Sequence, residues 1–146
     1  MKIPFYLVTP EKIVFQQEVE SATIPTVDGE ITVLPMHVPL ITALTHGVIQ
    51  LKTGSETHYV SVSHGVVKVD SMGITILSTH AERADEMIME QVEKALADAK
   101  KLAELKRESD EEYSQAMLLV AKEGARLHAL RKHHTRVQDM TGRSSS

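Results

Sequence analysis

The hydrophobic residues of this chain change their spacing at about Ala81, and this change limits the possible folds more than any other feature. Before it, apolar and polar residues alternate in short runs, as they do in half-buried β-strands. After it, apolar residues recur every three or four positions, as they do on one face of an amphipathic helix. The sequence therefore predicts a β-domain over residues 1–80 and a helical domain over residues 81–136.

The first segment is predicted to contain several short antiparallel strands. The runs Val48–Lys52 and Thr57–Val62 flank a Thr53-Gly54-Ser55 turn, which is typical of a β-hairpin. Turn signals recur roughly every ten residues, and this regularity favours an antiparallel sandwich or barrel. A segment of about eighty residues is long enough to bury a modest core.

The second segment contains two helical stripes of matching step. The first stripe is Ile88, Val92, Ala95, Ala99 and Leu102, and the second is Tyr113, Met117, Val120, Gly124 and Leu127. Ser109 or Asp110 lies between them as the predicted N-cap of the second helix. Matched stripes with a short connection predict an antiparallel helical hairpin. The expected fold class is therefore α+β, with an antiparallel β-sandwich followed by a two-helix hairpin.

Two further expectations concern the second helix. Gly124 weakens this helix by about 1 kcal/mol relative to alanine, and we expect its missing side chain to let another backbone approach closely. Beyond His134 the apolar pattern ends. Residues 137–146 are accordingly predicted to form a disordered tail.

A turn and a proline-framed loop follow one another between Thr26 and Leu40. Asp28-Gly29 is a strong turn signal, because glycine adopts positive φ without steric cost. Pro35 and Pro39 each fix φ and remove a backbone donor. His37 is the ionisable residue between these prolines. The loop is therefore expected to be rigid, with His37 either ordering the loop or contacting a partner.

Composition excludes several functional classes. The 146 residues carry a net charge of −4, which gives no electrostatic case for nucleic-acid binding. The chain has no cysteine, so disulfides and cysteine-based zinc sites are excluded. No apolar run approaches the roughly 20 residues that cross a bilayer, and the N-terminus lacks signal-peptide and transit-peptide patterns. We expect no direct insertion into a membrane.

The charge is divided unevenly between the two predicted helices. Residues 81–112 contain six basic and eleven acidic side chains, whereas residues 113–146 contain six basic and two acidic side chains. Opposite charge favours pairing of the two helices. It also allows the basic helix to exchange its partner for a more acidic one.

No catalytic or metal-binding motif is present. None of the eight histidines forms the i,i+4 pair that chelates metals on a helix. The chain also lacks a nucleophile elbow, a Walker loop and a His-Glu-x-x-His motif. We therefore predict no catalytic residues, no metal site and no cofactor.

Several motifs, in their order along the chain, resemble the epsilon subunit of bacterial and chloroplast F-type ATP synthases. They are Val8-Thr9-Pro10-Glu11, Val14-Phe15, Asp28-Gly29-Glu30, Leu34-Pro35-Met36-His37-Val38-Pro39-Leu40, and Leu44 with Gly47. The resemblance implies a β-sandwich followed by two helices. It also implies a non-catalytic rotor subunit that couples rotation of the membrane c-ring to the gamma shaft, while its hairpin inhibits ATP hydrolysis.

The resemblance also implies partners for particular residues. Glu30 would face the c-ring, and the gamma subunit would be contacted by His37, Val38 and Pro39. When the hairpin extends, an acidic segment of the catalytic beta subunit would meet the basic residues Arg126, Arg131 and Lys132. The sequence Ala125-Arg126-Leu127 supports the role of Arg126, whereas the other two are assigned by charge. The alpha subunit would be a further neighbour, and the protein would lie on the cytoplasmic face of the bacterial membrane or on the thylakoid membrane.

The chain departs from the family pattern at the first helix. Some members carry Ile/Leu-Asp-x-x-Arg-Ala, a motif that helps bind ATP, but Ile88 and Gln91 replace its Asp and Arg here. We therefore expect weak or absent ATP binding. Thr32 and His64 replace two glycines of the family without threatening the fold. An alternative function is a free-standing adaptor, in which the sandwich binds one protein and the hairpin binds another.

Overall fold

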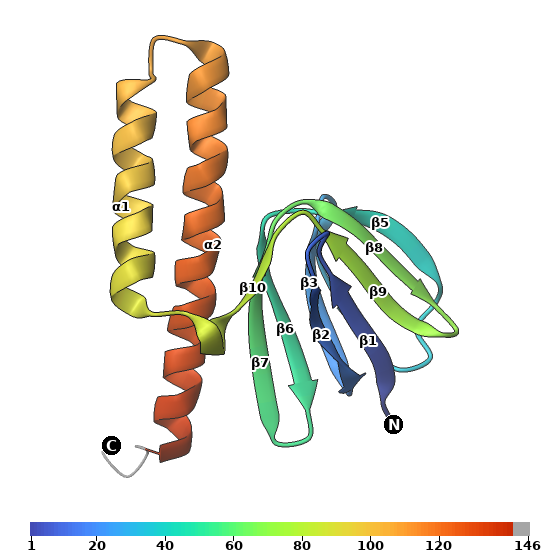
Figure 1. The fold of residues 1–146 in the computed structure, drawn as a ribbon. Helices are drawn as coiled ribbons and strands as arrows, with labels where there is room; N and C mark the ends of the chain where they lie inside the picture. The colour runs from blue at the N-terminus through green and yellow to red at the C-terminus, as the bar shows by residue number, and fades with distance from the viewer. Residues whose placement is uncertain (142–146) are drawn as a thin grey trace.

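The computed structural model describes residues 1–141 and shows a β-sandwich with a helical hairpin along one side (Figure 1). The strands are β1 Ile3–Val8, β2 Ile13–Val19, β3 Ser21–Thr26, β4 Gly29–Val33, β5 Leu40–Leu44, β6 Gly47–Thr53, β7 Glu56–Val62, β8 Gly65–Asp70, β9 Gly73–Ser78 and β10 Ala81–Arg83. A short 3-10 helix, Ala84–Glu86, precedes α1, Met89–Leu105, and α2, Asp110–Thr141.

The strands form two layers that face each other across the core. One layer contains β5, β8, β9, β1 and β2, and the other contains β4, β3, β6, β7 and β10. A single pairing of Thr26 with Leu44 joins β3 to β5 and links the layers. Neighbouring strands are antiparallel except β1 and β9, which run parallel. The predicted α+β class and its sandwich are confirmed.

Alternation of side chains explains how the core is built. Phe5 and Leu7 of β1, for example, point inward and are fully buried, whereas Tyr6 between them is exposed. Ile74 and Ile76 of β9 contribute to the same core. The predicted hairpin around Thr53-Gly54-Ser55 is confirmed, since β6 and β7 pair along their whole length.

The sheet continues further than the sequence suggests. Ala81–Arg83 forms β10 and pairs with β7 at its edge, so the β-structure extends beyond residue 80. Ala84–Glu86 then forms one 3-10 turn, and α1 begins only at Met89. Strand β10 is therefore the link through which the sandwich is joined to the hairpin.

The helical hairpin is confirmed, and its predicted stripes are buried in part: Val92, Ala99 and Leu127 are buried, whereas other members are exposed. Ser109 acts as the N-cap of α2, because its Oγ accepts a hydrogen bond from the Glu112 amide at 3.4 Å. Small residues fill the seam between the helices, notably Ala99, Ala103 and Ala116. The larger residues Leu102 and Met117 of the predicted stripes are 39% and 41% exposed.

The expectation for Gly124 is wrong, and that for the tail is wrong in part. A β-carbon placed on Gly124 would meet no atom within 4 Å, so no backbone approaches this position closely. Helix α2 continues through residues 137–141, where a disordered tail was predicted. The rest of that predicted tail, residues 142–146, lies outside the described residues.

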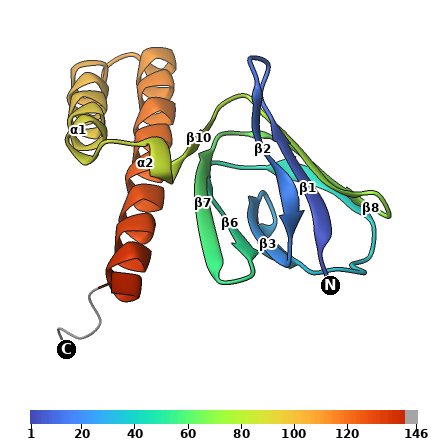
Figure 2. The same ribbon diagram turned by 60° about the horizontal axis from the view of Figure 1, so that its bottom comes forward.

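The hairpin is docked on the outer face of β6 and β7. A second apolar cluster fills this interface, separate from the sandwich core. Its buried members are Ala84, Met87, Val92, Leu127, Ala129 and Leu130, and Val48, Tyr59, Met89 and Leu96 pack against them. Figure 2 shows the C-terminal half of α2 lying along β7, while α1 lies farther from the sheet. The structure thus has the compact arrangement of the hairpin.

Candidate functional site

The proline-framed loop is held by its own hydrogen bonds. The His37 amide donates to the Leu34 carbonyl at 3.1 Å, and the His37 ring Nδ1–H donates to the Val38 carbonyl at 2.7 Å. Met36 adopts a positive φ of 70°, which is unusual for a residue other than glycine. His37 therefore orders the loop, as one of the two readings of the sequence expected. A partner contact by His37, Val38 or Pro39 stays a prediction.

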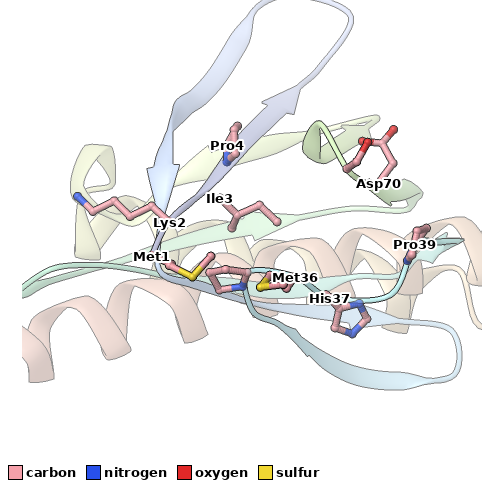
Figure 3. Close-up of a pocket in the computed structure, with 10 residues that line it drawn as sticks. Met1, Lys2, Ile3, Pro4, Met36, His37, Pro39 and Asp70 are labelled. Carbon is pink, nitrogen blue, oxygen red and sulfur yellow. The ribbon is translucent and has the colours of Figure 1, made fainter.

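This loop forms one side of a shallow apolar pocket of about 450 Å³ (Figure 3). The N-terminal residues Met1–Pro4 form another side, and the β8–β9 turn at Asp70 completes it. Val38, next to the pocket, is 74% exposed. The pocket and loop thus present apolar groups at one end of the sandwich.

Glu30 lies at the opposite end of the sandwich from His37. It follows the β3–β4 turn, where Gly29 has a φ of 110° and its carbonyl accepts a hydrogen bond from the Thr26 hydroxyl at 2.5 Å. Thr26 pairs with Leu44 at one end of β5, whereas the proline loop enters β5 at the other end. Glu30 is exposed at the start of β4. The two predicted contact regions are therefore separated by the length of the strands.

Four neighbouring strands carry one apolar residue each in register on the outer face of the sandwich. These residues, which we name the apolar row, are Ala43 on β5, Val66 on β8, Leu77 on β9 and Val8 on β1. Val66 and Leu77 are 45% and 53% exposed. No element within residues 1–141 packs over this face, whereas the hairpin covers the opposite layer (Figure 1).

The apolar row is not among the features predicted from the sequence, although the sequence contains a signal for it. Val66-Val67 and Ile76-Leu77 each place two apolar residues side by side in a strand. Neighbouring residues of a strand point to opposite faces, so one member of each pair must lie outside the core. Val67 and Ile76 are the buried members. The break in alternation therefore marks the second apolar face.

An ion-pair cluster centred on Arg126 joins α2 to the sheet. Its guanidinium donates to both carboxylate oxygens of Glu82 on β10, at 2.6 and 3.2 Å, and to Glu123 on α2 at 2.5 Å. Burial alone would lower the pKa of Arg126, but the hydrogen bonds to Glu82 and Glu123 outweigh burial and raise the pKa. Arg126 is therefore fully engaged while the hairpin is docked.

His80 lies beside this cluster, at the start of the link. Its Nε2 is buried and has no hydrogen-bond partner among the described residues. Burial lowers the pKa of His80, and the nearby charges of Lys122 and Arg126 lower it further, against the opposing carboxylates of Glu82 and Glu11. The docked hairpin thus favours the neutral imidazole.

Arg131 and Lys132 lie on α2 beyond Arg126. Both are exposed, and they border a separate pocket with Tyr59 of β7. The structure therefore does not gather the three predicted inhibitory residues into one cluster: Arg126 is paired, and the other two face solvent. Within residues 1–141 no group of three His, Asp or Glu side chains could hold a metal ion. None of the helices in this range is long and apolar enough to cross a membrane.

These features define the class of the protein. It is a two-part α+β protein, in which a β-sandwich with one bare apolar face is joined by a short link to a docked helical hairpin. The family model for the β-sandwich domain of the ATP synthase delta/epsilon chain matches residues 2–84. The chain belongs to this family.

Similar proteins agree with this assignment. An ATP synthase epsilon chain of Nitratidesulfovibrio vulgaris is 36% identical over 113 residues, covering 77% of this chain and 84% of the relative. That of Halalkalibacterium halodurans is 33% identical over 121 residues, covering 83% and 91%. That of Desulforamulus reducens is 42% identical over 89 residues, covering 61% and 67%.

The fold also occurs in a solved structure. A chain in the Euglena gracilis mitochondrial ATP synthase, OSCP/F1/c-ring, superimposes with a TM-score of 0.74 at 22% identity, covering 88% of this chain and 81% of that chain. The match spans more than the sandwich, so it extends the similarity in fold into the helical hairpin.

Proposed function

We propose that this chain is a non-catalytic rotor subunit in the central stalk of a proton-translocating F-type ATP synthase. The observation that carries the proposal is the bare apolar row, which lies on the same layer as the strand that the proline-framed loop enters. Exposed apolar patches of this kind are typical of protein interfaces. A closely packed sandwich resists shear, which suits a domain that transmits torque between two partners. The relatives named ATP synthase epsilon chains support this role.

The sandwich would contact two different partners. The layer that carries the apolar row also receives the proline-framed loop, at the other end of its strands, so the apolar row and the loop residues His37, Val38 and Pro39 would be two separate contacts with the gamma shaft. Glu30, exposed at the end opposite this loop, would face the polar loops of the c-ring. Contact with both partners would turn ring and shaft as one body. The protein would then lie peripherally on the cytoplasmic face of the bacterial membrane.

The hairpin would regulate ATP hydrolysis at the alpha and beta subunits. In its extended form, Arg126, Arg131 and Lys132 would contact an acidic segment of the catalytic beta subunit. Arg126 is bound to Glu82 and Glu123 in the docked arrangement, so inhibition first requires release of these contacts. Two arrangements that differ by a few kcal/mol can be exchanged by small differences in contacts.

Substitutions in the apolar row test the shaft surface. We expect Val66→Asp/Leu77→Asp to abolish co-purification with the gamma subunit, because two charges would be buried against an apolar partner. Both side chains point away from the core, so the sandwich should still fold. Circular dichroism of the isolated chain checks the fold, and quantitative mass spectrometry of the purified complex gives the copy number.

A matched control keeps the same change in charge elsewhere. Gln91→Asp/Gln115→Asp alters two exposed residues of the hairpin and should leave one copy per complex. Normal assembly of Val66→Asp/Leu77→Asp would rule out the apolar row as the shaft surface. If the unmodified chain does not co-purify with alpha, beta and gamma subunits at a fixed ratio, the adaptor function replaces the rotor function.

A further inference from the structure

A basic pocket lies where the C-terminal part of α2 crosses β7. Arg131, Lys132 and Arg136 border it, with Lys132 and Arg136 four positions apart on one side of the helix, and Tyr59 of β7 forms the opposite wall. The cavity has a volume of about 390 Å³. It is thus formed by the hairpin and the sandwich together, and exists only while the hairpin is docked.

The cations of this pocket differ from Arg126 in their partners. Arg126 is bound by two carboxylates, whereas the ion pairs found within residues 1–141 include none to Arg131, Lys132 or Arg136. One carboxylate, that of Asp139, lines the pocket as well. Three permanent positive charges therefore face one negative charge.

Two of these side chains are held in position by the sandwich. Arg136 donates a hydrogen bond from Nη2 to the Ser55 carbonyl in the β6–β7 turn, while its Nε is buried without a hydrogen-bond partner among the described residues. The Lys132 ammonium lies 6.0 Å from the centre of the Tyr59 ring, within range of a cation–π contact. The pocket is therefore partly preorganised for a negatively charged ligand.

We propose that this pocket binds a phosphate group, either free inorganic phosphate or pyrophosphate, or the phosphates of a nucleotide. Arginine forks match the geometry of phosphate oxygens, and lysine supplies a point charge. The Thr135 hydroxyl, which also lines the cavity, adds one donor. A phosphate dianion balances the charge excess better than a single carboxylate does. Lys132 already lies over Tyr59, so the pocket recognises phosphate and offers no free ring for stacking a base.

Phosphate binding at this place would favour the docked hairpin. A ligand shifts a conformational equilibrium only by binding one state better than the other. Release of the hairpin would separate α2 from Tyr59 and from the Ser55 carbonyl, and so dismantle the pocket. The site does not include Ile88 or Gln91, the positions at which the family's ATP motif is changed. This proposal goes beyond the rotor role, which does not depend on phosphate.

Titration of the full chain with sodium pyrophosphate tests the site. We expect amide shifts in ¹⁵N NMR spectra confined to Tyr59 and to residues 128–139, with chloride at equal ionic strength giving none. Arg131→Gln/Arg136→Gln should weaken pyrophosphate binding at least about 10-fold, since two guanidinium groups that can each donate paired hydrogen bonds are lost. Arg131→Lys/Arg136→Lys keeps the charge and should weaken binding less.

The control is Lys100→Gln/Lys101→Gln, which removes two exposed charges from α1 and should leave binding unchanged. The proposal is overturned if Arg131→Gln/Arg136→Gln and Lys100→Gln/Lys101→Gln weaken pyrophosphate binding equally, or if amide shifts occur at all basic residues. Either result would show a nonspecific ionic effect. Orthophosphate and ATP are titrated in parallel. If orthophosphate binds and ATP binds no more tightly, the ligand is free phosphate. If ATP binds more tightly and Arg131→Gln/Arg136→Gln abolishes this binding, the ligand is a nucleotide. Absence of binding by all three overturns the site and leaves co-purification with the gamma subunit unaffected.

Discussion

The guanidinium of Arg126 on α2 donates hydrogen bonds to both carboxylate oxygens of Glu82 on β10, which lies 44 positions earlier in the chain. The same guanidinium binds Glu123, whose side chain is 8% exposed. A buried carboxylate needs a partner, because desolvation penalises its charge. Arg126 thus stabilises both the contact between hairpin and sheet and the charge that α2 buries.

Arg126→Gln should therefore weaken docking of the hairpin. Hydrogen bonds to charged groups contribute roughly 1.5–3 kcal/mol each when partners are left buried, so we expect a loss of about 1–3 kcal/mol for this partly exposed cluster. The chain has no cysteine, so labels at Glu56→Cys and Gln138→Cys can report the distance between β7 and α2 by pulsed electron paramagnetic resonance. A longer, broader distance distribution is expected.

The matched control for this substitution is Arg107→Gln. Arg107 is an exposed cation at the tip of the hairpin, and the ion pair that it makes within residues 1–141 is with Glu104 on the preceding helix. Exposed pairs of this kind contribute little to stability. An unchanged distance in Arg126→Gln would show that the apolar cluster alone holds the hairpin.

Acidification should also release the hairpin, through His80. Its pKa is below the ordinary value of 6.5 in the docked state, because of burial first and then the charges of Lys122 and Arg126. Glu82 and Glu11 oppose this shift without cancelling it. Release would restore the ordinary pKa. The contribution of His80 to docking is therefore complete above pH 6.5 and is lost as pH falls below 6.5 toward the docked-state pKa.

The same labelled pair can be measured between about pH 7.5 and pH 5 to follow this release. We expect the docked fraction to fall with pH in the unmodified chain and to vary much less in His80→Gln, which is neutral throughout. The control is His134→Gln, which replaces an exposed histidine near the end of α2. Its docked fraction should depend on pH as that of the unmodified chain does. A docked fraction that falls equally in His80→Gln would assign the effect to other groups.

Local sequence signals predicted the elements of this fold well. The β6–β7 hairpin follows from a turn at Gly54 between alternating strands, and Ser109 marks the start of α2 as its cap. These signals depend on residues within a few positions of one another. The same reasoning placed Val92 and Ala99 correctly among the buried residues, but it also placed Leu102 and Met117 there, which are partly exposed, because periodicity alone does not give the width of the buried face.

Contacts between distant segments could not be predicted in this way. Ala81–Arg83 resembles the start of a helix, and only its pairing with β7 makes it a strand. Arg126 gives no indication from its neighbours that its partner is Glu82. The apolar row likewise depends on the register of four strands. Among the predicted contact residues, the role of His37 in ordering its loop depends on local hydrogen bonds. Which residues share a face of the sandwich, by contrast, depends on how the strands pair in the sheet.

Two glycine substitutions should change stability in opposite directions. A β-carbon on Gly65 would lie 1.9 Å from the Leu77 carbonyl oxygen, so β8 and β9 would have to separate. We expect Gly65→Ala to lower the free energy of unfolding by about 1–3 kcal/mol, as other overpacked substitutions do. Gly124→Ala meets no neighbouring atom and should stabilise α2 by about 1 kcal/mol.

Urea unfolding followed by far-ultraviolet circular dichroism measures both glycine variants. The unmodified chain is the common reference, and the pair differs only in whether the added methyl group has room. A stable Gly65→Ala would show that β8 and β9 can shift apart at little cost. A destabilised Gly124→Ala would show that the hairpin seam is tighter than the structure indicates.

Removal of the hairpin should raise ATP hydrolysis by the reconstituted complex. The deletion must begin at residue 88, because Ala81–Arg83 belongs to the sheet and Ala84 is buried against it. This truncation keeps the apolar row and the proline-framed loop, so assembly with the gamma subunit should persist. The expected rise follows from loss of the basic residues proposed to meet the catalytic beta subunit.

A full-length variant separates charge from bulk in this last experiment. Arg126→Gln/Arg131→Gln/Lys132→Gln removes the three cations but retains both helices, and should raise hydrolysis as the truncation does if charge carries the inhibition. Steady-state hydrolysis is measured with complexes of equal subunit content. If the triple variant resembles the unmodified chain while the truncation is activated, inhibition arises from the bulk of the helices. If neither changes hydrolysis, the hairpin has no inhibitory role, and the sandwich retains its proposed role in coupling because none of its proposed contact residues lies in the hairpin.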